Sequence, residues 1–207
     1  LKKYIILTGA TGWIGRNFLH ELQKIFPSEI FNNYIIAFGS KIGKIKSSAY
    51  PQKQTIEIPI YPLSSIKNFI KKGEDYLFIH TAFLTREKVN STYIKEYIKM
   101  NRQINSYLKI AISKVSNPKC IYISSGAATV FENKKYNEKR IDLDPYGFLK
   151  LEEEKILSKI STCLVLRVYA LSGKFIRDPN IFAFGNFILR AIENQPIEIK
   201  AKHQVIR

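Results

Sequence analysis

The chain has 207 residues, of which 45% are hydrophobic and 24% charged, as in a soluble globular protein with a full core. No apolar stretch approaches the roughly 20 residues of a membrane span, and a strand-like run begins at once, so we expect a cytoplasmic protein with no membrane span. The net charge of +16 permits nucleic-acid binding, but the lysines are spread along the chain, so we expect no nucleic-acid partner and instead an anionic cofactor and substrate.

Three glycines stand where a predicted strand meets a predicted helix. Residues 4–7 are uniformly apolar, and apolar residues recur at helical spacing over 14–26. In this context the first glycine makes a tight turn, the second lets the backbone approach a ligand, and the third lets the helix pack closely. The free amides of the helix would then face a pyrophosphate, unless the turn serves packing only. The expected cofactor-binding residues here are Gly9, Thr11, Gly12, Trp13, Ile14 and Gly15.

The sequence Thr8-Gly-Ala-Thr-Gly-Trp-Ile-Gly15 resembles the extended, nucleotide-sugar-modifying branch of the short-chain dehydrogenase/reductase superfamily. The resemblance implies a doubly wound parallel α/β sheet (a Rossmann fold), an NAD or NADP cofactor and a nucleotide-diphosphate sugar substrate. It also implies a nucleotide-binding domain over residues 1–170 and the start of a smaller substrate lobe over 171–207. Members of the branch continue further, so we expect this lobe to be incomplete here.

The end of the second predicted strand, 34–39, bears on the choice of cofactor. An acidic residue at this place would hold the ribose 2′-hydroxyl of NAD and repel a 2′-phosphate. Here Ser40 and Lys41 follow the strand, Lys44 comes next, and no acidic residue precedes Glu57. NADP is therefore favoured, with NAD left open because these lysines also fit a solvated basic loop.

The middle of the chain continues the alternation of strands and helices. Strands are predicted at 54–60, 75–82 and 119–126, with a short helix over 64–72 and a long one over 91–114. The two cysteines fall in strand-like runs without disulfide or zinc spacing, so we expect reduced thiols and no metal site.

A His-x-Ala segment ends the predicted strand 75–82. The resemblance places its backbone along the cofactor, which makes His80, Thr81 and Ala82 cofactor-binding residues and leaves direct chemistry by the imidazole as the lesser alternative. Thr85 or Arg86, just beyond, is expected to touch the substrate.

Asn101 lies inside the long predicted helix. The resemblance gives it a catalytic role, holding the active lysine through a water molecule, whereas the plainer interpretation is a surface asparagine. The same helix contributes to a dimer interface in the extended branch, and its aromatic residues and Met100 permit a homodimer or equally a buried core face.

The strongest chemical signal combines a serine pair with a tyrosine and a lysine. Ser124 and Ser125 end a predicted strand, and Tyr146 and Lys150 are four residues apart on a helix that opens at Pro145, so they share one face. A nearby ammonium stabilises phenolate, which would lower the pKa of the phenol. We expect Tyr146 to move a proton at a sugar oxygen, Lys150 to tune it and bind the ribose, and Ser125, rather than Ser124, to orient the oxygen.

The last part of the chain is predicted as a strand at 162–168, a helix at 184–192 and a strand at 196–200. Asn186 and Arg207 match positions that touch the nucleotide diphosphate in the family, although a surface arginine explains Arg207 almost as well. The favoured function is an NADP-dependent 4-keto-6-deoxy nucleotide-sugar reductase. An NAD-dependent epimerase and a non-catalytic NADP-binding sensor or scaffold on the same fold stay open.

Overall fold

The computed structural model describes residues 3–48, 55–89, 93–132, 141–142, 144–171, 173–176 and 178–199. Within them lies one seven-stranded sheet of strand order β3-β4-β2-β1-β5-β6-β7. Every pairing is parallel except that of β3 with β4. The strands are β1 (Lys3–Thr8), β2 (Ile35–Gly39), β3 (Gly43–Ser48), β4 (Thr55–Pro62), β5 (Asp75–His80), β6 (Lys119–Ser125) and β7 (Thr162–Val168).

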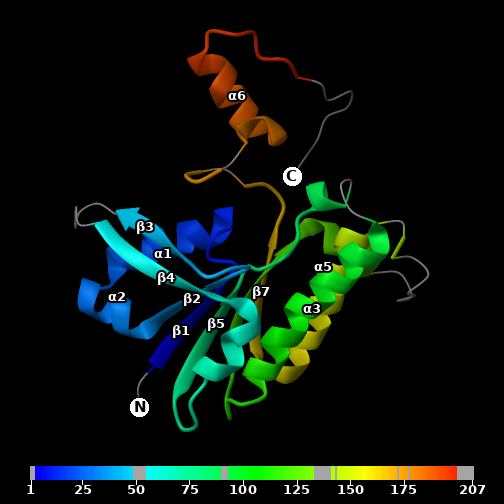
Figure 1. Ribbon diagram of the computed structural model, residues 1–207. Helices are drawn as coiled ribbons and strands as arrows, with labels where there is room; N and C mark the ends of the chain where they lie inside the picture. Colours follow the sequence, from blue (N-terminus) through cyan, green and yellow to red (C-terminus); the bar gives the residue numbers. More distant parts are fainter. Residues whose placement is uncertain are drawn as a thin grey trace.

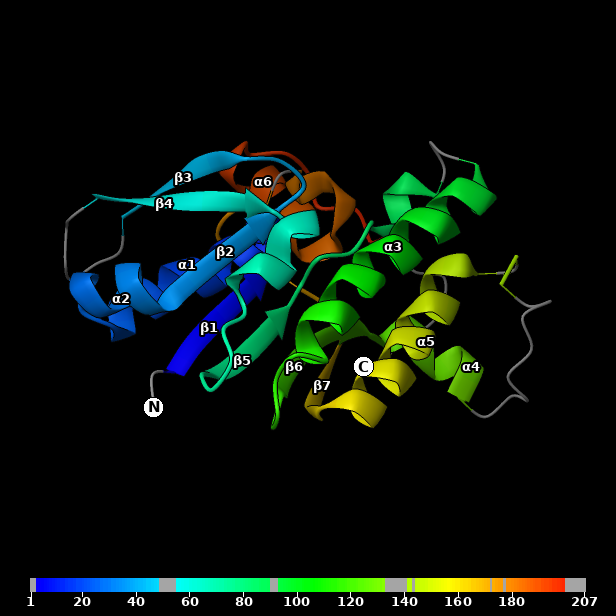
Figure 2. The same cartoon turned by 60° about the horizontal axis from the view of Figure 1, so that its bottom comes forward.

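Helices cover both faces of the sheet, as a doubly wound fold requires (Figure 1). Figure 2 shows α3 and α5 side by side, with α1 and α2 lying along the other half of the sheet. The helices are α1 (Trp13–Ile25), α2 (Ser28–Tyr34), α3 (Ile94–Ile112), α4 (Thr129–Glu132), α5 (Pro145–Ile160) and α6 (Ala183–Ile192). Segments of 3-10 helix stand at Leu63–Phe69, Arg86–Lys88, Gly126–Ala128 and Pro179–Ile181. The predicted Rossmann fold is confirmed.

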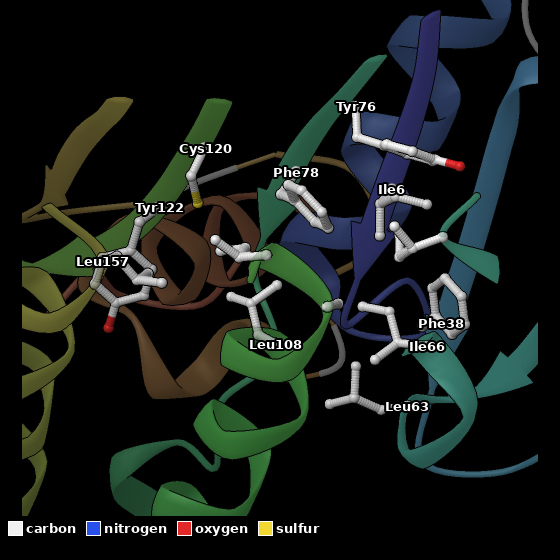
Figure 3. Close-up of a cluster of buried hydrophobic side chains, with 13 residues drawn as sticks. Ile6, Phe38, Leu63, Ile66, Tyr76, Phe78, Leu108, Cys120, Tyr122 and Leu157 are labelled. Atoms are coloured by element: carbon white, nitrogen blue, oxygen red, sulfur yellow. The ribbon is translucent and has the colours of Figure 1, made fainter. Parts of the chain in front are cut away.

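Two apolar clusters hold the layers together, and the alternation of β1 feeds both. Ile6 points toward α3, where it joins Phe78 and Leu108 (Figure 3), while Leu7 points toward α1 and packs with Leu19. All five side chains are almost wholly buried. Because successive strand residues face opposite sides, an uninterrupted apolar run is what a strand covered on both faces needs.

Three local features differ from the sequence-based predictions. Residues 43–48 form β3, an antiparallel edge strand that was not predicted. Lys44 and Lys46 are exposed on either side of buried Ile45, which is the period of a strand. Residues 28–34 form α2, which was not predicted. The strand expected at 196–200 is absent over its described part, 196–199, whose residues are exposed.

The segment after β7 reaches back to the first helix. The carbonyl of Lys174 accepts hydrogen bonds from Trp13 Nε1 and Asn17 Nδ2, both at 2.8 Å, and the rings of Trp13 and Phe182 are 5.2 Å apart. Beyond this contact α6 stands off the carboxyl end of the sheet (Figure 1), and none of its residues is buried. In the described ranges, no helix combines the length and apolarity needed to cross a membrane.

Candidate functional site

The strand order changes direction between β1 and β5, and the carboxyl ends of these strands frame the site. Gly9, directly after β1, has a φ of +74°, and a Cβ there would lie 2.6 Å from the backbone nitrogen of Ala82. A Cβ on Gly15 would overlap the carbonyl of Gly9, so α1 is packed against the turn. Gly12 is the N-cap and has no side chain to cap the first amides, which remain free for an anion.

Two adjoining cavities, each about 740 Å³, form a cleft at this edge of the sheet. One extends past the glycine turn to Gly39, Ser40 and Ser64. The other extends to the predicted catalytic residues Ser125, Tyr146 and Lys150. The residues common to both are Gly12, Trp13, Thr81, Phe83, Thr85, Glu87 and Phe182. A continuous cleft of this size suits an extended ligand that spans both walls.

Tyr146 sits in the first turn of α5, whose start is fixed by its N-cap. Asp144 Oδ1 accepts a hydrogen bond from the Gly147 amide at 3.1 Å, and Pro145 occupies the first helical position. Burial raises the pKa of the Tyr146 phenol, and a hydrogen bond with the Ser125 side chain opposes that rise. The structure thus brings the predicted serine and tyrosine together.

Lys150 is buried one helical turn further along. Its Nζ donates to the carbonyl of Ile123 at 2.8 Å and lies 3.9 Å from the ring centroid of Phe83. Burial lowers the pKa of Lys150 to about 8. The sequence predicted a tyrosine pKa lowered by this ammonium; instead the pKa of Tyr146 is raised, because desolvation outweighs the opposing contributions of Ser125 and the Arg86 guanidinium.

The two serines at the end of β6 have different surroundings. Ser124 is buried, and its hydroxyl donates to Glu154 Oε1. Ser125 is half-buried and interacts with Tyr146. Its Oγ also accepts from the Ala127 amide at 3.2 Å. This arrangement favours Ser125 as the hydroxyl available to a ligand, as the position at the strand end predicts.

Asn101 is fully buried in α3, which rules out a surface asparagine. Its Oδ1 accepts from the Leu84 amide at 2.9 Å, and its Nδ2 donates to the Tyr97 carbonyl at 3.2 Å. These bonds anchor the segment whose Phe83 ring covers Lys150. The structure therefore connects Asn101 to the lysine through that segment.

His80 points away from the cleft into a layer of polar side chains beneath α5. It is fully buried, with Nδ1 2.5 Å from Thr8 Oγ1 and Nε2 2.6 Å from Glu153 Oε1. Only its neighbours Thr81 and Ala82 line the cleft. The cofactor contact of this segment stays a prediction, and the His80 side chain has internal partners that the sequence did not reveal.

Arg86 lies at the mouth of the cleft beside Thr85 and joins two parts of the site. Its guanidinium is 5.2 Å from the ring centroid of Tyr146 and donates to Asp144 Oδ2 at 2.7 Å. The helix-capping carboxylate therefore also holds a cation over the phenol. Sequence reasoning considered Arg86 only as a substrate contact, and did not find Asp144.

The remaining predicted residues lie at or beyond the ends of the cleft. Ser40 lines it, whereas exposed Lys41 is not among its lining residues and Lys44 pairs with Glu57 at 2.8 Å. Asn186 donates to Asn180 Oδ1 at 3.0 Å and does not line the cleft. Arg207 lies outside the described residues. Within the described ranges, no cluster of side chains is suited to hold a metal ion.

Comparison with known proteins gives one family match and several structures of similar fold. The model of the NAD dependent epimerase/dehydratase family matches residues 5–201. An epimerase, Mth375 from Methanothermobacter thermautotrophicus, is similar in structure with a TM-score of 0.60 and 20% identity over 97% of this chain and 62% of that one. MoeE5 in complex with UDP-glucuronic acid and NAD has a TM-score of 0.59 and 20% identity, covering 95% and 64%.

A UDP-N-acetylglucosamine 4-epimerase from Bacillus cereus is also similar, with a TM-score of 0.53 and 20% identity over 94% of this chain and 64% of that one. At this identity the likeness establishes the fold. The chain spans less than two thirds of the length of each of these structures. No curated protein matched the sequence.

Proposed function

Because the chain belongs to the NAD-dependent epimerase/dehydratase family, we propose that it is a nicotinamide-dependent oxidoreductase of a nucleotide-linked sugar. The observation that carries this proposal is the convergence of Ser125, Tyr146 and Lys150 on one wall of a cleft whose other wall is the start of α1. A pyrophosphate at those free amides would direct the rest of the dinucleotide toward Tyr146. Hydride transfer is the chemistry that the bound nicotinamide supplies.

The side chains of this site have separable tasks. Tyr146 exchanges a proton with the sugar oxygen, and the Ser125 hydroxyl orients the same oxygen. The Lys150 ammonium would bind the ribose of the cofactor. Phe83, packed over that ammonium, helps to exclude water from it. Asn101 keeps the Phe83 segment in place through the Leu84 amide.

We place the reductive direction first. A phenol whose pKa is raised by burial is protonated at neutral pH and is ready to donate to a carbonyl oxygen. This supports a 4-keto-6-deoxy sugar reductase. Epimerisation, which begins with oxidation, needs a phenolate; it is the second candidate because the Bacillus cereus structure described above is a 4-epimerase and MoeE5 was solved with NAD.

The residues at the end of β2 support NADP as the cofactor. The cleft reaches Ser40 without meeting a carboxylate at the end of β2, and Lys41 follows it. A hydroxyl and an ammonium suit a 2′-phosphate. The pairing of Lys44 with Glu57 leaves fewer cations for that phosphate than the sequence suggests, so NAD is the alternative. Three further expectations stay predictions: a substrate lobe beginning after residue 170, a homodimer through α3 and a cytoplasmic location.

Titration with NADPH and NADH, followed by reduced-nicotinamide fluorescence, tests the proposal. Tighter binding of NADPH would support the phosphate pocket, and preference for NADH would overturn it and favour the epimerase. Turnover of 4-keto-6-deoxy nucleotide sugars and UDP-hexoses then separates the reactions. Binding without turnover of any of these substrates would favour the sensor or scaffold, and absence of binding would contradict a nicotinamide site.

A further inference from the structure

Beneath α5 lies a set of buried polar side chains to which the proposed mechanism gives no task. His80, Tyr122 and Glu153 come from β5, β6 and α5, and all three are fully buried. A buried carboxylate is costly unless nearby groups compensate its charge. Glu153 stands three residues after Lys150 on the same helix, so the Lys150 ammonium is a candidate to compensate its charge.

The contacts around Glu153 define its orientation. Its Oε1 lies 2.6 Å from His80 Nε2, and His80 Nδ1 lies 2.5 Å from Thr8 Oγ1. Both contacts are satisfied when Nε2–H donates to the carboxylate and Nδ1 accepts the threonine hydroxyl. In that arrangement the imidazole is neutral and Glu153 keeps its negative charge.

Tyr122 connects the pair with Lys150. The His80 ring is stacked on the Tyr122 ring at 5.7 Å between centroids, and Lys150 Nζ lies 4.8 Å from the centroid of the same ring. Burial, the charge of Glu153 and a hydrogen bond with the Glu153 side chain raise the pKa of the Tyr122 phenol. The carboxylate thus sits against the ring that the ammonium also touches.

Glu154, the other buried acid of α5, is already compensated. Arg167 donates to both of its oxygens, from Nε at 2.9 Å and from Nη2 at 2.6 Å, and Ser124 donates to Oε1. Among the described residues, the hydrogen-bonding neighbours of Glu153 are the His80 imidazole and the Tyr122 hydroxyl, neither of which carries a permanent positive charge. Both carboxylates raise the pKa of Lys150, and Glu153, which has no such cation, has the larger effect.

We propose that Glu153, oriented by His80, is a positioning residue that supplies the counter-charge of the Lys150 ammonium and keeps it protonated during the reaction. This inference rests on the proposed function for the role of Lys150. Of the titratable groups packed around Lys150, Glu153 and Glu154 on α5 act on its charge, and Tyr122 on β6 contacts it. Tyr146 on α5 lines the same cavity, and His80 on β5 is connected to Lys150 through Tyr122 and Glu153. In agreement, Glu153 is the leading opponent of the burial that lowers the pKa of Lys150.

The direct test is an NMR titration of the Lys150 side chain in the whole 207-residue chain, with 13C-labelled lysine and assignment by Lys150→Arg. The unmodified chain should titrate at about 8. Glu153→Gln retains a partner for His80 and should lower the midpoint by about one pH unit, because it removes a nearby opposite charge. The matched control is Glu152→Gln, one residue earlier, where the acid pairs with Arg102 at the surface; its midpoint should not move.

A second replacement, Glu153→Met, keeps the test decisive if the glutamine variant does not fold. A folded variant of either kind with an unchanged Lys150 midpoint would overturn the inference. Equal shifts in the Glu153→Gln and Glu152→Gln chains would also overturn it, because the loss of any negative charge from α5 would then explain the change in midpoint. Long-range 1H–15N spectra of His80 should show Nδ1 without a proton, and a doubly protonated ring would contradict the assigned arrangement.

The titration requires neither cofactor nor substrate, so it separates this inference from the proposed function. A shifted midpoint in a chain that binds no nicotinamide nucleotide would keep the inference about charge and remove the function. Where turnover is found, the alkaline limb of the kcat/KM profile should move to lower pH in Glu153→Gln and stay in place in Glu152→Gln. A uniform loss of activity at every pH would indicate a merely structural role.

Discussion

The two sides of the sheet bury different kinds of side chain. On the α1 side, side chains such as Leu7, Leu19 and Phe31 fill an apolar cluster, and the functional feature is backbone, at the glycine turn. On the α5 side, Lys150 and Glu153 are buried beside the apolar cluster, and the functional features are side chains. On the α1 side the binding function can be lost without a loss of stability, whereas on the α5 side the buried charges contribute to both.

The physical reason is the cost of burying charge. An apolar cluster tolerates substitutions that keep its volume, because no group in it depends on a particular partner. A buried ammonium or carboxylate depends on its partners, and removing one leaves the other uncompensated. The α5 side therefore holds groups whose pKa values are shifted, Lys150 downward and Tyr146 upward, close to the cleft.

The largest effect is expected from the substitution that changes chemistry and spares the packing. Tyr146→Phe removes the proton donor and keeps the ring beneath Arg86, so turnover should fall by about a thousandfold. Unfolding by heat and affinity for reduced nicotinamide nucleotide should change little. Retained turnover would show that another group moves the proton.

The next effect should appear in stability, at the compensated carboxylate. Arg167→Met leaves Glu154 buried without its cation and should lower the free energy of unfolding by about 3 kcal/mol. Arg102→Met, which breaks the more exposed pair with Glu152, should cost about 0.5 kcal/mol. Urea denaturation of the two variants measures the difference. Equal losses would mean that the α5 side is no more dependent on paired charges than the surface.

A third pair of substitutions separates packing from binding on the α1 side. Gly15→Ala places a Cβ against the Gly9 carbonyl and should destabilise the fold by about 2 kcal/mol. Gly12→Ala meets only the same carbonyl, at 3.2 Å, and should instead weaken nicotinamide nucleotide binding by about tenfold, or about 1.4 kcal/mol. Gly43→Ala is the control, since among the described residues nothing lies within 4 Å of the added Cβ. If Gly12→Ala left binding unchanged, the α1 amides would not be the anion site.

Most elements were predictable where an apolar run coincides with a clear boundary. The strand at 162–168 has the predicted limits, and α5 begins at the predicted Pro145. The failures occurred where periodicity is weak. In β3, Ile45 is buried between two exposed lysines. Residues 196–199 contain one charged residue among apolar ones and have no partner strand among the described residues. Whether such a segment forms a strand depends on the strands available to pair with it, and a single sequence does not show which strands lie next to each other.

The part of the site that was predictable consists of residues close together in the sequence. Tyr146 and Lys150 share a helix face at a fixed interval, so the motif implies their geometry. The pairing of His80 with Glu153 joins residues 73 positions apart. In the sequence Glu153 is the middle of three consecutive glutamates that resemble a solvated helix face. Only the packing of α5 against the sheet shows that Glu153 is the one of the three that is fully buried.

The smallest expected effect concerns the lysines after β2, the side chains that would contribute to cofactor binding on the α1 side. Lys41→Gln should weaken NADPH binding by about threefold, the scale of a solvent-exposed ion pair, and leave NADH binding unchanged. Lys44→Gln should change neither affinity, because Lys44 is engaged by Glu57 on the neighbouring strand. Fluorescence titrations of both variants at low salt, where screening is weakest, give the comparison. A larger loss in Lys44→Gln would place the 2′-phosphate nearer β3, and equal NADPH and NADH affinities in the unmodified chain would show that this side reads the cofactor through backbone alone.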